Sequence, residues 1–147
     1  MFKSWFGLKN ILHYYGDSVR QLFILSALIF VVVVPLWGDL LPFGEQGALL
    51  QIAIAIGLVI LAGFTSPRSM LSIVLDLFAA GIGAFLLEAA AISFYRTDSW
   101  LLFFARELVA VMLLFALYFS VKTLRAMLVG SIGGDRDVVK KDERKNI

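Results

Sequence analysis

Three charged residues, Glu88, Arg106 and Glu107, lie within otherwise apolar sequence. Ionisable groups inside a membrane segment are costly to bury, usually face protein or water, and mark functional-site hypotheses. If the two stretches that carry them fold back near Thr97, Glu88 lies at the depth of Arg106 and Glu107. A planar guanidinium can bind a carboxylate through two hydrogen bonds, so we expect a Glu88–Arg106 ion pair.

Glu107 has no obvious partner within the chain. Adjacent helical residues point about 100° apart, so Arg106 and Glu107 cannot face Glu88 equally. Three interpretations of Glu107 stay open: it is protonated, it is paired across a subunit interface, or it faces a water-filled crevice. For the whole cluster we favour an ion pair that fixes helix register over a proton or cation site or a contact with another subunit.

Asp76 predicts a second polar contact, close to the cytoplasmic side of the membrane. It lies about two turns into its apolar stretch, and the same hairpin places it near Lys122. Both side chains can reach water or each other, so an interfacial pair is expected. Asp76 and Glu88 are about 18 Å apart along one helix. Because only apolar residues separate them there, a proton path between them needs partners from elsewhere.

Small residues recur at four-residue spacing in two of the apolar stretches. The pairs are Ala53 with Gly57, Ala79 with Gly83, and Ala80 with Ala84. Such pairs let helices approach closely in lipid, where the hydrophobic drive for association is absent. Packing within the chain is the favoured interpretation, ahead of a self-association face and of residues that line a permeation path.

Four apolar stretches must position these residues, at about 22–37, 48–64, 70–95 and 99–124. A helix needs about 20 mostly apolar residues to cross the hydrocarbon core. The chain has 147 residues, of which 61% are hydrophobic, and this leaves no room for a separate soluble domain. We therefore expect an all-α, polytopic integral membrane protein whose four transmembrane helices form two hairpins over residues 21–125.

The two ends of the chain have a different composition. Residues 1–20 combine aromatic and basic residues at helical spacing, which predicts an amphipathic helix in the membrane interface, anchored by Trp5 and Phe6. The alternative is a helix packed on the cytoplasmic end of the bundle. Residues 126–147 are expected to form a flexible, charged cytoplasmic tail.

Lysine and arginine predict the orientation of the chain, because cytoplasmic flanks carry an excess of them. They concentrate before the first stretch and after the fourth, so both termini are expected to be cytoplasmic. Trp37 and Trp100 then belong to the outer aromatic belt. A bacterial-type inner (plasma) membrane is the expected location.

The sequence lacks the residues that several classes of function require. The chain has no cysteine and one histidine, His13, so thiolate chemistry and multi-histidine metal sites are excluded within one chain. Phosphate-binding loops and pairs of nucleophile and base are also missing from the sequence. We expect no enzyme activity, no metal, no cofactor and no nucleic-acid partner.

The favoured function is that of a structural or assembly subunit. Its partners would be the lipid bilayer and either further copies of the chain or other membrane subunits, with the Glu88, Arg106 and Glu107 cluster fixing the contacts. The alternative is a small oligomeric, proton- or cation-coupled transporter or channel that uses Glu88 or Glu107.

Overall fold

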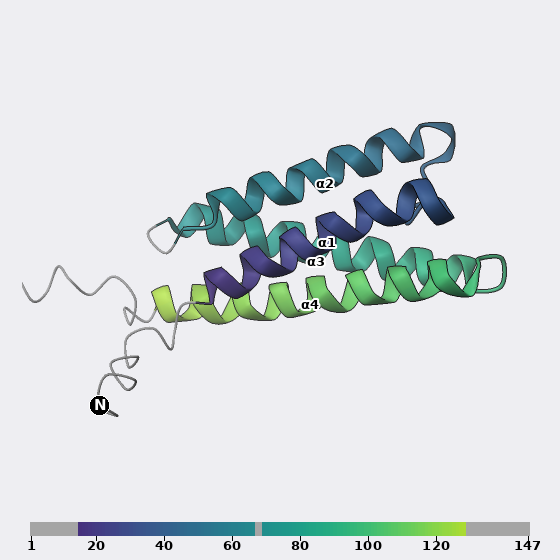
Figure 1. The fold of residues 1–147 in the computed structure, drawn as a ribbon. Helices are drawn as coiled ribbons and strands as arrows, with labels where there is room; N and C mark the ends of the chain where they lie inside the picture. The colour runs from purple at the N-terminus through teal and green to yellow at the C-terminus, as the bar shows by residue number, and fades with distance from the viewer. Residues whose placement is uncertain (1–14, 67–68, 129–147) are drawn as a thin grey trace, which may run out of the picture.

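A computed structural model describes residues 15–66 and 69–128 of the chain, apart from the side chain of Glu45. The regular structure of this part is entirely helical, and its four long helices are each long and apolar enough to cross a membrane. The elements are α1 (Gly16–Trp37), the short 3-10 helix η2 (Gly44–Gln46), α2 (Gly47–Phe64), α3 (Met70–Phe94) and α4 (Trp100–Leu128) (Figure 1). Residues 1–14 and 129–147, with most of the expected interfacial helix, Trp5, Phe6 and the tail, lie outside the described residues.

Two helices are longer than the hydropathy pattern indicated. The first begins at Gly16, so residues 16–20 belong to α1 and not to a separate interfacial helix. Asp17 lies in its first turn, 3.8 Å from the guanidinium of Arg20. A carboxylate there interacts favourably with the helix dipole, which helps a helix start in polar sequence. At the other end, α4 continues through Arg125 to Leu128.

Helix α4 is the central packing element. It packs along α3 and α1, while α1 also packs on α2 and the α2–α3 contact is sparse (Figure 1). Its buried residues recur at alternating three- and four-residue intervals, a pattern that keeps one face of a helix against its neighbours. They include Leu102, Arg106, Val109, Leu113, Ala116, Ser120 and Thr123. Arg106 and Ser120, two polar residues discussed below, lie on this buried face.

The segment between α1 and α2 enters the bundle instead of staying on its surface. Gly38 and Gly44 have φ values of 103° and 71°, which glycine adopts at little cost. Between them, Leu40 and Leu41 are buried. The loop therefore contributes backbone polar groups to the interior, where each must find a hydrogen-bond partner.

Small residues bring α3 and α4 close together. Ala80 and Ala84 are buried, and a methyl group added to Gly83 would meet Cδ1 of Leu113 on α4 at 2.7 Å. By contrast, a methyl group on Gly81 would lie 3.6 Å from Leu117, an ordinary contact. Close approach of these two helices thus depends on Gly83 more than on Gly81.

Substitution of Gly83 tests this packing. Gly83→Ala should lower the free energy of unfolding by about 1 kcal/mol, the low end of the cost of overpacking, because the methyl group displaces the flexible end of the buried Leu113 side chain. Gly81→Ala, in the same helix, should cost less than about 0.5 kcal/mol. Unfolding curves in mild detergent measure both. Equal losses for the two variants would show that Gly83 is not a special contact.

An apolar cleft lies where α2 and α3 diverge. It encloses about 260 Å³, and its walls include Ile54, Gly57 and Leu58 of α2 and Ala79, Ile82 and Gly83 of α3. A methyl group on Gly57 would meet no atom within 4 Å, and Ala53 one turn earlier is exposed. The Ala53–Gly57 pair is therefore not used for packing within the described part of the chain.

Candidate functional site

Arg106 is a buried cation, with 2% of its surface exposed. It lies six residues after Trp100, about 9 Å along α4 from the start of the helix. Its place on the buried stripe, between Leu102 and Val109, directs it into the bundle. A buried guanidinium must find acceptors for its N–H groups, since leaving it unpaired costs several kcal/mol.

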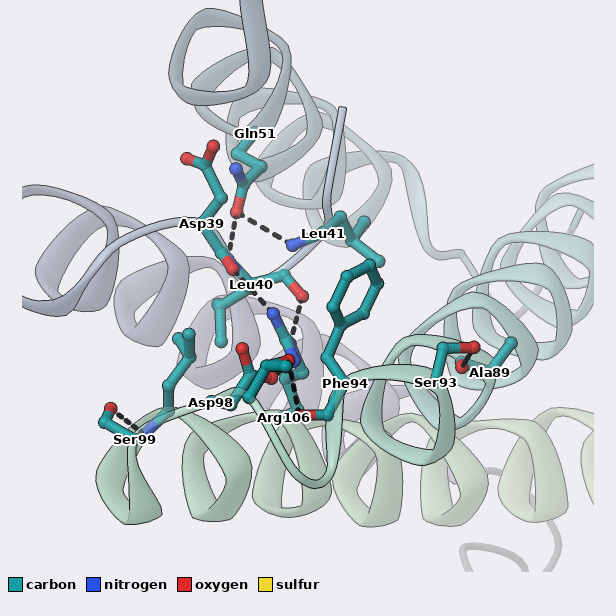
Figure 2. Close-up of polar contacts among 12 residues, drawn as sticks. Asp39, Leu40, Leu41, Gln51, Ala89, Ser93, Phe94, Asp98, Ser99 and Arg106 are labelled. Carbon is teal, nitrogen blue, oxygen red and sulfur yellow. Dashed lines mark hydrogen bonds and ion pairs between the residues drawn. The ribbon is translucent and has the colours of Figure 1, made fainter. Parts of the chain in front are cut away.

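The loop and the α3–α4 turn supply those acceptors (Figure 2). Nε of Arg106 donates to the carbonyl oxygen of Leu40 over 2.6 Å, and NH2 donates to that of Asp39 over 3.0 Å. NH1 forms an ion pair with Asp98, whose side chain is mostly buried. The ring of Phe94 lies 5.6 Å from the guanidinium carbon, which adds a cation–π contact. Arg106 therefore ties the loop after α1 to the turn before α4.

Gln51 holds the same loop from the side of α2. Its Oε1 accepts from the backbone N–H groups of Leu40, over 2.6 Å, and Leu41, over 3.2 Å. Its Nε2 donates to the carbonyl oxygen of Gly47, over 3.1 Å. Figure 2 shows Leu40 between Gln51 and Arg106, with its N–H bound by one side chain and its carbonyl by the other. We call Arg106, Asp98, Gln51 and the backbone of residues 39–41 the loop clamp.

The expected Glu88–Arg106 ion pair is not formed. All three guanidinium nitrogens of Arg106 face Asp98 or loop carbonyls, and the ion pairs among residues 15–66 and 69–128 do not include Glu88. The physical reason is that an inward-turning loop and a turn carboxylate lie closer to the guanidinium than the carboxylate on the neighbouring helix. Glu88 and Glu107 are each half-buried, and their charges interact with each other.

The expected Asp76–Lys122 pair is also not formed. Asp76 is buried, and its Oδ2 lies 2.9 Å from the hydroxyl of Thr65, at the end of α2. Lys122 is exposed and its ammonium lies over the rings of Tyr15, at 4.7 Å, and Tyr118, at 5.8 Å. The ammonium group of Lys122 therefore makes cation–π contacts with two aromatic rings and stays hydrated.

The remaining expected residues are distributed as follows. Ala79 is half-buried beside the apolar cleft, while Trp37 and Trp100 are exposed at the end of the bundle that carries the loop clamp. Exposed indole rings at helix ends suit the membrane–water boundary.

Several residues of the loop clamp were not singled out from the sequence as site residues. Asp98 and Gln51 are not among the residues that the sequence patterns indicate. The signal for Gln51 was available, because a glutamine inside an apolar helix needs partners for up to four hydrogen bonds. The carbonyls of Asp39 and Leu40 have no signature in side-chain patterns.

The chemistry open to the loop clamp is structural. Its donors and acceptors are matched to one another, and in the described ranges no group of three or more His, Cys, Asp or Glu residues could hold a metal ion. Comparison with known proteins adds no assignment, since no family model, curated protein or solved structure matches the chain.

Proposed function

We propose that the chain is a structural or assembly subunit of a homo-oligomer or a larger membrane complex, set in a bacterial-type inner membrane with both termini cytoplasmic. The observation that carries this proposal is the use of Arg106, which binds the chain's own loop and turn. A buried charge that is satisfied internally fixes geometry and leaves no cation exposed to a permeating anion.

The packing of α2 supports the assembly role. This helix contacts α3 sparsely, and its Ala53–Gly57 pair lies against open space. Small pairs of this kind permit close contact with another transmembrane helix. The apolar walls of the cleft beside Gly57 suit a helix surface or lipid rather than a hydrated ion.

A substitution on α2 tests the assembly role. Gly57→Leu places its Cβ in open space beside the apolar cleft, so the fold should persist while the association constant falls about tenfold, or about 1.4 kcal/mol. Gly63→Leu is the matched control, because Gly63 also faces open space but points away from Gly57 around the helix. The particle mass in mild detergent, followed over a range of protein concentration, measures association. Monomeric wild-type protein that co-purifies with no other chain would refute the proposal.

A second candidate is a proton- or cation-coupled transporter or channel. It is favoured by Glu88 and Glu107, which are half-buried, close enough for their charges to interact, and in no ion pair of the described part. Protein in liposomes should then carry a flux that Glu88→Gln or Glu107→Gln abolishes without loss of assembly. No flux under any proton or cation gradient would eliminate this candidate.

A further inference from the structure

Asp76 is a buried carboxyl group without a counterion among the residues that the structure describes. Only 2% of its surface is exposed, and its Oδ1 has no hydrogen-bond partner. It lies six residues after Met70, about 9 Å along α3 from the start of the helix. No lysine or arginine of residues 15–66 and 69–128 lies within ion-pair distance of it. An isolated carboxylate in such a place is normally neutralised rather than left charged.

The contacts of Thr65 indicate how Asp76 is neutralised. The Thr65 hydroxyl lies 3.0 Å from the carbonyl oxygen of Leu61 and 2.9 Å from Oδ2 of Asp76. A hydroxyl has one hydrogen to donate, and a carbonyl oxygen can only accept. If Thr65 donates to Leu61, the hydrogen in the second bond must come from Asp76. Both bonds are made at full strength only when Asp76 is a carboxylic acid.

The helix opposite carries a second buried polar group without a partner. Ser120 of α4 is buried, and its hydroxyl has no hydrogen-bond partner. Gly83 faces Leu113 across the α3–α4 contact. Asp76 precedes Gly83 by seven residues and Ser120 follows Leu113 by seven, which is close to two helical turns. Because the helices are antiparallel, Asp76 and Ser120 lie at about the same level, and neither Oδ1 nor the Ser120 hydroxyl has a hydrogen-bond partner in the structure.

We propose that Asp76 is a proton-binding site that fastens α2 to α3. With the proton bound, hydrogen bonds run from Asp76 to Thr65 and from Thr65 to the carbonyl of Leu61. On release of the proton to water, the carboxylate has no donor hydrogen for Thr65, and Thr65 can donate to only one of its two neighbours. Because α2 contacts α3 sparsely elsewhere, α2 then separates from α3 and the apolar cleft between them widens.

No charged side chain of the described residues packs against Asp76, so we assign the response to pH to Asp76 itself. Helix α2 has no charged residue, and Glu88 on α3 is about 18 Å away along the helix. The charged groups of α1 and α4 at this end are exposed side chains that water screens. They are Asp17, Arg20, Lys122 and Arg125. Arg68, in the connection between α2 and α3, lies outside the described residues.

Spin-label distances between α2 and α3 test the proposal on the full chain in lipid nanodiscs. The chain has no cysteine, so Val59→Cys with Phe85→Cys places one label on an exposed position of each helix. Between pH 5 and pH 9, the wild-type background should lose its short-distance population. Asp76→Asn should keep that population at both pH values, because an amide does not ionise and can donate to Thr65. Asp17→Asn, an exposed match, should behave like the wild-type background.

Other outcomes overturn the proposal. A distance distribution that does not change with pH in the wild-type background contradicts it, whatever the variants do. A change that follows replacement of Na⁺ by choline at constant pH shows a metal cation and not a proton at Asp76. As a second variant, Thr65→Val should show the longer distances at pH 5 as well, and retention of the short distance there would refute the tie through Thr65.

Discussion

Replacing Arg106 with alanine is expected to lower the free energy of unfolding by about 3–5 kcal/mol, the usual loss when one partner of a buried ion pair is removed. The substitution leaves Asp98 without its cation and the carbonyls of Asp39 and Leu40 without donors. It should also release the loop after α1, so proteolysis of that loop should accelerate. Unfolding in mild detergent and a timed protease digest measure the two effects.

Two matched variants show whether the loss reflects the fork geometry of Arg106. Arg96→Ala removes an exposed arginine from the nearby turn and should change stability by less than about 0.5 kcal/mol. Arg106→Lys keeps the charge but cannot donate in three fixed directions, so it should recover only part of the stability. If Arg106→Lys restores full stability, charge alone is sufficient and the contacts with two loop carbonyls carry little energy.

Replacing Gln51 with leucine has the second largest expected effect, about 2–4 kcal/mol of destabilisation, from leaving two buried N–H groups unpaired at about 1–2 kcal/mol each. The affected groups are the backbone amides of Leu40 and Leu41, which both donate to Oε1 of Gln51. Leucine has nearly the same volume as glutamine, so lost packing contributes little. Amide hydrogen exchange at Leu40 and Leu41 should accelerate together with the fall in stability.

Gln46→Leu is the matched control for this prediction. Gln46 is exposed, and its side chain makes no capping hydrogen bond to α2. The same chemical change should therefore leave stability within about 0.5 kcal/mol of the wild type. A loss at Gln46 as large as that at Gln51 would mean that the loop tolerates no leucine for a reason other than its hydrogen bonds.

The sequence was sufficient to predict four apolar helices, because long, mostly apolar stretches with few charges have few other uses in a chain of this composition. It was also sufficient to single out Arg106 as a buried charge. It was insufficient for the partners of Arg106, because two of them are backbone carbonyls of a loop. Side-chain patterns describe which face of a helix is buried, but not that Leu40 turns inward between two glycines.

The two incorrect pairs share a cause. Glu88–Arg106 and Asp76–Lys122 were inferred from matching depth along a hairpin, which fixes height but not the direction of a side chain. Asp98 reaches Arg106 from the turn, and Thr65 reaches Asp76 from the end of α2. In both cases the partner lies at a helix end. The backbone there can bend towards a buried group, whereas the direction of a side chain within a helix is fixed by the helix.

The most direct test of the account is a pair of double-mutant cycles on the free energy of unfolding, one for Arg106 with Asp98 and one for Arg106 with Glu88. Each cycle isolates the energy of one contact from the general effects of substitution. We predict a coupling of about 1.5–3 kcal/mol between Arg106 and Asp98, as for hydrogen bonds to charged groups, and none above experimental error between Arg106 and Glu88. Coupling of Arg106 to Glu88 without coupling to Asp98 would contradict the loop clamp. It would show instead that Arg106 pairs with Glu88 between α3 and α4.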